Sequence, residues 1–216
     1  MVVLYPTNGV SAIQERQMLS LANDRLKVIA IEGNFDDAQK LVKKVFNDPD
    51  RFNYSPNIPL SSANSINIGR LIPQIVYYFY GYFKLVKSDN IGEKINFVVP
   101  TGNFGNILAG FLAKKMGLPI NKLICASNDN KVLTDCASNE NNVLTDFFNN
   151  KVYDKNRSFL KTSSPSMDIL VSSNLERLLY YCCEDVTLVK DYMTSLDTNG
   201  KYQVNESFNK VLDNFY

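Results

Sequence analysis

A glycine-rich segment between an apolar run and a helix-like run has the residue types of a phosphate-binding loop. It spans Thr101 to Asn106, reads TGNFGN, follows FVVP and precedes NILAGFLAKKMG. Gly102 and Gly105 allow backbone N–H groups to turn inward, and the positive end of the following helix points at the same place. Thr101, Asn103 and Asn106 add polar donors without charge. The pattern indicates a cradle for a permanently held phosphate ester; the alternative is a tight turn whose glycines serve geometry alone.

The loop follows neither of the common nucleotide-binding patterns. No GK[ST] comes after the glycines, and their spacing departs from GxGxxG. The chain also has no histidine, which excludes a Ser-His-Asp or Cys-His catalytic group and a His-ligated metal within it. Its cysteines lack the two-residue gap of zinc ligands and redox dithiols. We therefore expect no metal site, and we expect reduced, buried cysteines in a cytoplasmic protein. The cysteines are Cys125, Cys136, Cys182 and Cys183.

A second polar cluster precedes a strongly apolar helix-like run. Residues 61–70 read SSANSINIGR, and a helix beginning there would have Arg70 in its first turn. Ser65, Asn67 and the guanidinium could then face an oxyanion such as a carboxylate or phosphate. On the residues alone, a capped and solvated helix entry is the favoured interpretation.

Apolar runs and helix signals alternate along the chain and predict the elements that position these segments. Strands are expected at 2–5, 27–31, 95–99 and 122–126, and helices at 11–22, from 34 onward, at 70–86 and 106–116. Ser173 and Asn174 offer a cap for a further helix that continues through about Cys183. The first two strands have the consecutive apolar positions of strands covered on both faces. Helix 70–86 is nearly all apolar, so we expect protein on most of its sides. Two short helices are expected over 185–216, separated at Asn199 and Gly200.

This alternation predicts an α/β fold in which helices on both faces cover a parallel sheet in three layers. A tandem copy interrupts the order: CASNDNKVLTD at 125–135 is followed by CASNENNVLTD at 136–146. Two copies are too few for a solenoid, which indicates a local duplication. The inserted residues could extend a helix in phase or form a bulged loop.

Charge and hydropathy exclude two classes of partner. The 23 basic and 22 acidic side chains leave a formal charge of +1, which gives no reason to expect nucleic acid or an anionic membrane. Apolar runs such as 75–83, interrupted by Gly81, fall well short of the roughly 20 residues that span a bilayer. We therefore expect no transmembrane segment.

Five segments taken together resemble threonine synthase, a pyridoxal phosphate enzyme of the tryptophan synthase β-type fold (fold type II). They are LYPTNGVSAIQERQM, SSANSINIGRLIPQIVYYF, VVPTGNFGNILAGFLAKKMGLP, ASNENNVLTDFF and SPSMDILVSSNLERLLYY, in collinear order over nearly the whole chain. The resemblance implies that the cofactor phosphate is bound by the loop residues Thr101, Gly102, Asn103, Phe104, Gly105 and Asn106. It also implies substrate contacts for Asn64, Ser65, Asn67 and Arg70.

The implied reaction converts O-phospho-L-homoserine and water to L-threonine and phosphate by γ-elimination and β-hydration, with the cofactor as electron sink. In this family the lysine that holds the cofactor lies before the LYP strand, and another segment approaches the pyridine nitrogen after the matched region. Residues 1–216 are thus expected to be the central part of the enzyme, truncated at both ends and inactive alone. No catalytic residue is identified, and Lys114 and Lys115 are expected on a solvated helix face.

Two alternatives remain open from the sequence. One is another fold type II lyase or synthase, such as a threonine dehydratase or cysteine synthase, although SANSINIGR and SPSMDI favour threonine synthase. The other is a non-catalytic, truncated or degenerate protein that keeps a phosphate site. The oligomeric state is not predicted.

Overall fold

The computed structural model describes residues 1–50, 60–126, 147–148, 150–156, 169–208 and 212 of the 216-residue chain. The tandem copy occupies 125–146, so both forms predicted for its inserted residues lie outside the described residues. Among the described residues the strands form three two-stranded sheets.

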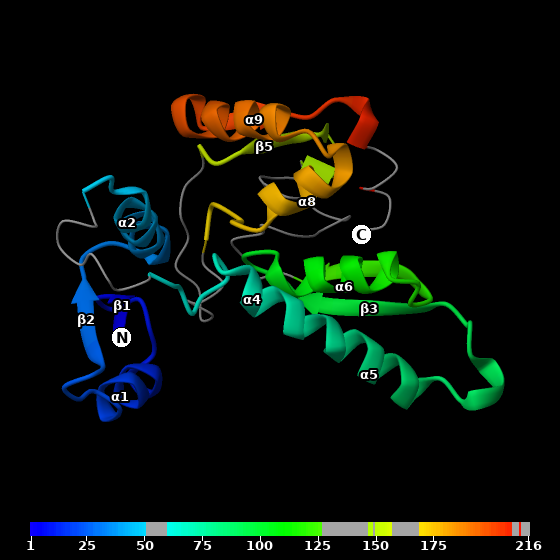
Figure 1. The fold of residues 1–216 in the computed structure, drawn as a ribbon, viewed down its shortest axis with the longest axis horizontal. Helices are drawn as coiled ribbons and strands as arrows, with labels where there is room; N and C mark the ends of the chain where they lie inside the picture. Colours follow the sequence, from blue (N-terminus) through cyan, green and yellow to red (C-terminus); the bar gives the residue numbers. More distant parts are fainter. Residues whose placement is uncertain (51–59, 127–146, 149, 157–168, 209–211, 213–216) are drawn as a thin grey trace.

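The N-terminal part alternates strands and helices as predicted. Its elements are β1 (Val2–Pro6), α1 (Ala12–Ser20), β2 (Lys27–Ile31) and α2 (Phe35–Asn47), and β1 pairs with β2 in parallel (Figure 1). Both helices begin with a capping box, at Ser11 and at Asn34. In each box the cap side chain accepts from the N–H of the third helical residue, and the side chain of that third residue accepts from the cap N–H. These local signals explain why the element boundaries agree with the prediction.

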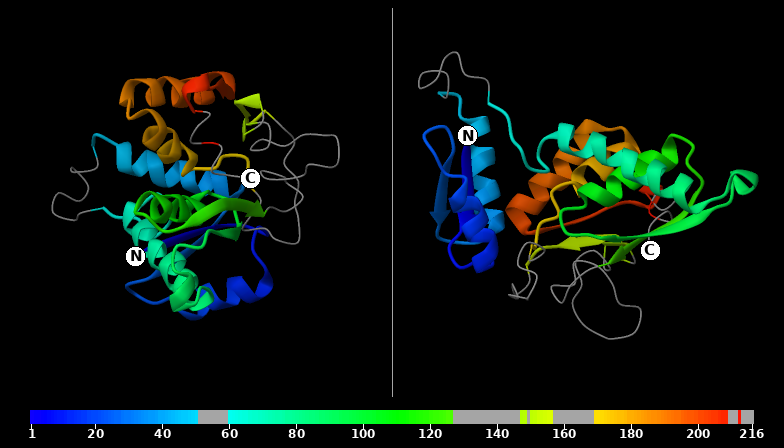
Figure 2. Two further views of the ribbon diagram at one scale, coloured as in Figure 1. Left: turned by 90° about the vertical axis from the view of Figure 1, so that its right-hand side faces the viewer. Right: turned by 90° about the horizontal axis from the view of Figure 1, so that it is seen from below.

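The prediction that β1 and β2 are covered on both faces is wrong for the described residues. Val2 is 61% exposed and Ile29 is 46% exposed. The reason is that this sheet has only two strands among the described residues. The neighbouring helices cover one of its faces, and no other described element lies on the second face (Figure 2). Asp36 ties this part to the rest by accepting from Leu170 N–H at 3.3 Å, and its burial there raises the pKa of its carboxyl group.

The middle of the chain contains a second parallel strand pair flanked by helices. Its elements are α4 (Ile68–Leu71), η1 (Ile72–Gln74), α5 (Ile75–Leu85), η2 (Ser88–Asn90), β3 (Ile95–Pro100), α6 (Gly105–Lys115) and β4 (Ile120–Ala126). β3 and β4 pair in parallel, as predicted. The helix expected from 70 begins instead at Ile68, and a 3₁₀ turn containing Pro73 interrupts it, because proline has no N–H for an α-helical bond.

Helix α5 buries one side only among the described residues. Tyr78 and Tyr82 are 3% and 1% exposed, whereas Tyr80 and Leu85 are 64% and 69% exposed. The expectation of protein on most sides of this helix is therefore wrong for the described chain. The apolar composition gave no indication of how much of its surface the described segments cover.

The C-terminal part contains an antiparallel strand pair that the sequence did not predict. Its elements are β5 (Val152–Asp154), α8 (Leu175–Cys183), α9 (Val186–Asn199), β6 (Lys201–Gln203) and η4 (Glu206–Phe208). The first of the two predicted helices is α9, and Gly200, with φ of 74°, ends it. Strand β6 follows where the second helix was expected.

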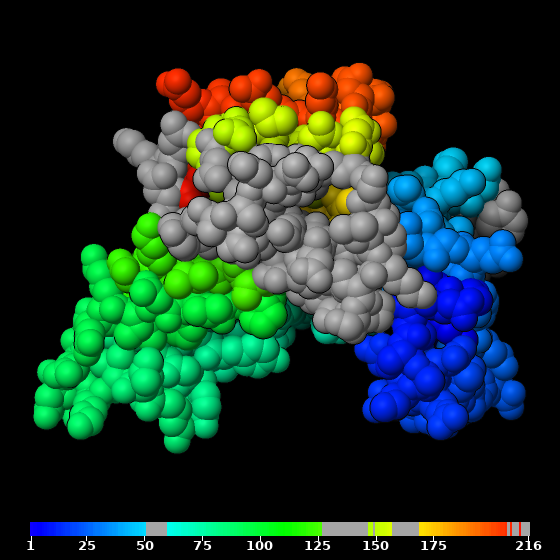
Figure 3. All heavy atoms as spheres, turned by 180° about the vertical axis from the view of Figure 1, so that it is seen from behind, coloured from blue at the N-terminus to red at the C-terminus, as the bar shows by residue number. Residues whose placement is uncertain are grey.

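One core joins the middle and C-terminal parts. Phe147, Tyr153 and Tyr202 contact one another there, the last two stacked with ring centroids 5.3 Å apart. Seen from behind, the N-terminal residues and the residues around α5 form separate protrusions on either side of this body (Figure 3).

The described cysteines carry free thiols, and one of them is buried as predicted. Cys125 is 1% exposed, and burial raises the pKa of its thiol to about 12. Cys182 and Cys183 are half-buried, and Cys136 lies outside the described residues.

Candidate phosphate-binding site

The glycine-rich loop connects the carboxyl end of β3 to the start of α6. Phe104 lies in the left-handed region with φ of 63°, which turns the chain sharply into the helix. Its ring is 1% exposed and lies 6.2 Å from that of Phe148, and its carbonyl accepts the first helical bond from Leu108 at 3.1 Å. Burial of this ring holds a backbone conformation that a non-glycine residue otherwise avoids.

The start of α6 presents backbone donors. The first N–H groups of a helix have no acceptor within the helix. Within the described ranges, the N–H groups of Gly105, Asn106 and Ile107 do not donate to any acceptor of the chain. A Cβ at Gly105 would lie 3.4 Å from Asn174 Nδ2 and 3.9 Å from the Cβ of Ser65, so the mouth of the loop is narrow. The place is suited to an anion.

Two loop side chains expected to add donors are used inside the protein. The Thr101 hydroxyl donates to the Val99 carbonyl at 2.7 Å. Asn106 Nδ2 donates to Gln74 Oε1 at 3.0 Å, while its Oδ1 and its carbonyl accept from the Tyr78 hydroxyl at 2.7 and 2.8 Å. Burial raises the pKa of Tyr78, so this phenol stays a donor. These side chains fix the shape of the loop, so the groups that remain to bind a ligand are the backbone N–H groups of the loop.

Three residues at the start of α8 hold the other side of the loop. Ser172 Oγ donates to the Gly102 carbonyl at 2.9 Å, and Asn174 donates to the Asn103 carbonyl from both N–H and Nδ2, at 3.1 and 2.8 Å. Ser173 Oγ donates to Asn103 Oδ1 at 3.3 Å. Sequence reasoning treated Ser173 and Asn174 as a helix cap. Asn174 is the N-cap residue of α8, but its side chain makes no capping bond and donates to the loop instead.

The polar cluster at 61–70 is mostly engaged with itself. Asn67 caps α4 by accepting from Gly69 N–H at 2.9 Å, and Asn64 Oδ1 accepts from Ile66 N–H at 3.2 Å. Arg70 is the third residue of the four-residue helix α4, so it lies in the first turn of the helical run as predicted, and it donates to the Ala63 carbonyl. Of the four predicted substrate contacts, Ser65 lies beside the loop, since a Cβ at Gly105 would lie 3.9 Å from the Cβ of Ser65.

Arg177 joins the segment at 61–70 to Asn174 at the start of α8, and the sequence did not predict this role. Its Nη1 donates to the Ser65 carbonyl at 2.9 Å and to Asn174 Oδ1, and its Nη2 donates to the Ile66 carbonyl. A cavity of about 590 Å³ lies beside this junction, and Ile66, Ser173 and Arg177 are part of its lining.

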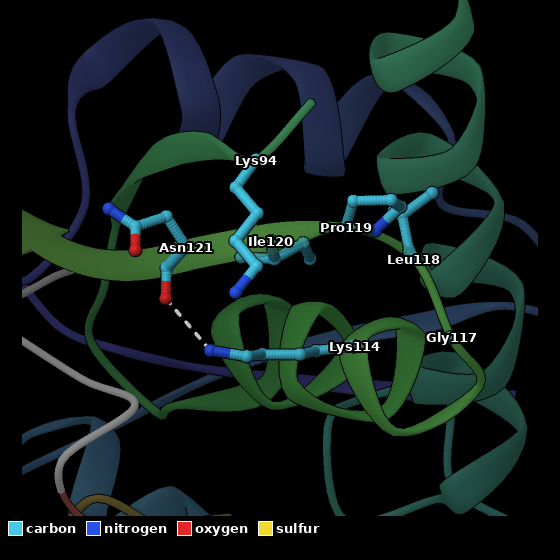
Figure 4. A pocket seen from close by; sticks show the side chains of 7 residues that line it. All are labelled: Lys94, Lys114, Gly117, Leu118, Pro119, Ile120 and Asn121. Atoms are coloured by element: carbon cyan, nitrogen blue, oxygen red, sulfur yellow. Dashed lines mark hydrogen bonds between the residues drawn. The ribbon is translucent and has the colours of Figure 1, made fainter. Parts of the chain in front are cut away.

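A second cavity, of about 350 Å³, lies at the other end of β3 and β4 (Figure 4). Lys114 lines it and donates to the Asn121 carbonyl at 2.8 Å, and burial and then the neighbouring Lys94 and Lys122 lower the pKa of its ammonium group. Lys114 is half-buried rather than solvated as predicted, whereas Lys115 is exposed. Both lie in the last turn of α6, roughly 15 Å along the helix from the loop, which is beyond the reach of a lysine side chain.

The described residues contain no group of three or more His, Cys, Asp or Glu side chains that could hold a metal ion. None of their helices is long and apolar enough to cross a membrane.

The sequence and the fold are similar to threonine synthases. Threonine synthase of Saccharomyces cerevisiae is 40% identical over 215 residues, which cover 95% of this chain and 39% of that protein. Human "Threonine synthase-like 1" is 40% identical over 213 residues, which cover 95% of this chain and 27% of that protein. No family model matches the sequence.

Two crystal structures match nearly the whole chain. The PLP-bound threonine synthase from Brucella melitensis has a TM-score of 0.77 and 40% identity, with coverage of 99% of this chain and 43% of that chain. Yeast threonine synthase has a TM-score of 0.77 and 38% identity, with coverage of 100% and 41%. These matches confirm the predicted fold class, of which the chain carries part. By sequence and by fold, the chain is a homologue of the threonine synthases that spans about two fifths of the length of the yeast and Brucella proteins.

Proposed function

We propose that this chain is a central segment of a threonine synthase and that residues 101–106 hold the phosphate of pyridoxal 5′-phosphate. The observation that carries the proposal is the set of N–H groups at the start of α6 that have no acceptor among the described residues and that lie at the carboxyl end of a parallel strand. The structural match to a PLP-bound threonine synthase supports it.

The loop fits a phosphate group that is held throughout turnover. It contains no cation, so backbone dipoles and the α6 macrodipole would balance the phosphate charge. Gly105 leaves room at the mouth, and Thr101 and Asn106 fix the loop through internal hydrogen bonds. Gly102, Asn103 and Phe104 would then contribute through the backbone.

In the complete enzyme, O-phospho-L-homoserine and water would give L-threonine and phosphate, and the cofactor would supply an electron sink for this chemistry. The residues of this chain would bind and orient the cofactor through its phosphate. Ser65 is the best placed of the proposed substrate contacts, and Asn64, Asn67 and Arg70 would shape the segment that carries it. The lysine that holds the cofactor aldehyde would come from a part of the family fold that this chain does not span. We place this biosynthetic role in the cytoplasm, consistent with the free thiols.

Binding of cofactor analogues tests the phosphate site. The 216-residue chain should bind pyridoxal 5′-phosphate at least about tenfold more tightly than pyridoxal, because the loop contacts only the phosphate. Calorimetric titration with each compound, with inorganic phosphate as competitor, measures the difference. Equal affinity for the two compounds would contradict the proposed role of the loop.

Transplantation tests the assignment to threonine synthase. A yeast threonine synthase in which this chain replaces the homologous segment should form threonine and phosphate from O-phospho-L-homoserine, whereas this chain alone should release no phosphate. A second chimera that lacks residues 125–135 serves as the matched control for the tandem copy. Two folded chimeras without threonine-forming activity would reject the assignment, as would turnover by the isolated chain.

A further inference from the structure

We propose that Ser172 and Asn174, braced by Arg177, are positioning residues that turn the backbone N–H groups of the phosphate loop toward the ligand. The inference rests on the proposed function, because it assigns a cause to the geometry of that same site. Figure 1 shows the start of α8 beside the starts of α4 and α6, where these residues meet the loop.

Hydrogen bonds from Ser172 and Asn174 orient the peptide planes of the loop. The described chain has no cis peptide bond, and in a trans peptide the C=O and N–H groups point in opposite directions. Ser172 holds the Gly102 carbonyl and Asn174 holds the Asn103 carbonyl, both from the α8 side. The N–H groups of residues 103 and 104 are therefore directed away from α8. A loop without these two donors could rotate its peptides and present carbonyls, which repel a phosphate.

The donors are themselves firmly held. Asn174 is 0% exposed and Ser172 is 4% exposed. Every polar group of the Asn174 side chain has a partner, since Nδ2 donates to the loop and Oδ1 accepts from Arg177. The Ser172 N–H donates to the Tyr153 hydroxyl at 2.8 Å, and burial raises the pKa of that phenol. Buried polar networks of this kind keep one geometry because an unpaired member is costly.

Arg177 extends the arrangement to the segment at 61–70. Its guanidinium donates to the carbonyls of Ser65 and Ile66 and to Asn174 Oδ1, so one planar group joins that segment to a residue that holds the loop. A role of the Asn174 side chain as a helix cap is not supported, because that side chain makes no capping bond to α8.

The test uses near-isosteric changes. Asn174→Asp keeps the acceptor for Arg177 and the backbone N–H donor to the Asn103 carbonyl but removes the side-chain donor, and Ser172→Ala removes the donor to Gly102. Each should weaken pyridoxal 5′-phosphate binding about tenfold and leave pyridoxal binding unchanged. Ser172→Thr keeps the hydroxyl donor and should therefore keep the affinity of the unaltered chain. Ser195→Ala is the matched control, because it removes a similar 2.7 Å hydroxyl-to-carbonyl bond, to Lys201, away from the loop.

A second measurement is independent of the cofactor. Leu108 N–H donates to the Phe104 carbonyl, so its hydrogen exchange reports whether the loop keeps its shape. Exchange at Leu108 should accelerate in Asn174→Asp and Ser172→Ala and stay unchanged in Ser195→Ala. If the unaltered chain binds the cofactor and the variants bind it equally, the inference is overturned while the proposed function stands. If the unaltered chain binds pyridoxal 5′-phosphate and pyridoxal equally, the proposed function is overturned. If Leu108 exchange is also unchanged in the variants, the inference is overturned as well.

Discussion

Gly105→Asp is expected to weaken pyridoxal 5′-phosphate binding by about 100-fold, equivalent to about 2.7 kcal/mol, while it leaves pyridoxal binding unchanged. The new carboxylate would lie at the first residue of α6 and accept the N–H groups that we assign to the phosphate. It would also repel the phosphate dianion directly. The fold should persist, since a Cβ there meets its nearest atom at 3.4 Å and an acidic residue suits a helix start.

The control for this substitution is Ile91→Asp, which adds the same charge at a position that is 63% exposed, before the start of β3. Its affinity for pyridoxal 5′-phosphate should equal that of the unaltered chain. Calorimetry gives both affinities, and circular dichroism verifies the fold. An unchanged affinity in a folded Gly105→Asp chain would remove the loop as the phosphate site.

Gly110→Ala should lower the free energy of unfolding by about 2 kcal/mol, because the cost of overpacking exceeds the roughly 1 kcal/mol that alanine gains over glycine in a helix. A Cβ at Gly110 would lie 2.5 Å from Tyr78 Cε1 and 2.9 Å from Leu123 Cδ2, between α5, α6 and β4. Displacement of Tyr78 would also disturb its hydrogen bonds to Asn106, so the phosphate affinity should fall too.

The matched control is Gly81→Ala, the same change in the middle of α5. Its Cβ would meet only Phe97, at an ordinary 3.6 Å, so the free energy of unfolding should rise by about 0.5 to 1 kcal/mol. Urea unfolding measures both changes. Equal effects at the two positions would show that helix propensity alone, and not the approach of α6 to Tyr78, decides stability at Gly110.

Most element positions could be predicted because their signals are local. Ser11 and Asn34 cap helices within three residues, and Gly117, with φ of 101°, ends α6 near the predicted place. Burial was predicted less well. The apolar face of α5 and the outer face of β2 are exposed among the described residues, since a side chain's hydropathy does not specify which segment covers it.

The position of the glycine loop between β3 and α6 was predicted from the sequence, but the residues that hold the loop were not. Ser172 and Asn174 lie 70 and 71 residues after their acceptors, and Arg177 lies 112 residues after Ser65. The run Ser173–Asn174 before an apolar helix has the pattern of an ordinary cap, and no local pattern distinguishes a donor to a distant carbonyl from a donor to its own helix.

The 70-residue separation between Gly102 and Ser172 also fixes an order of events during synthesis. At ordinary ribosome speeds, the loop leaves the peptidyl-transferase centre roughly 4 to 14 seconds before the side chain that holds it is made. Until the start of α8 has emerged and docked, the carbonyls of Gly102 and Asn103 in the nascent loop lack the donors Ser172 and Asn174. Under the proposed function, cofactor capture would therefore be a late event in the biogenesis of this protein, and a nascent chain stalled before residue 172 would carry the glycine motif without the donor that holds Gly102.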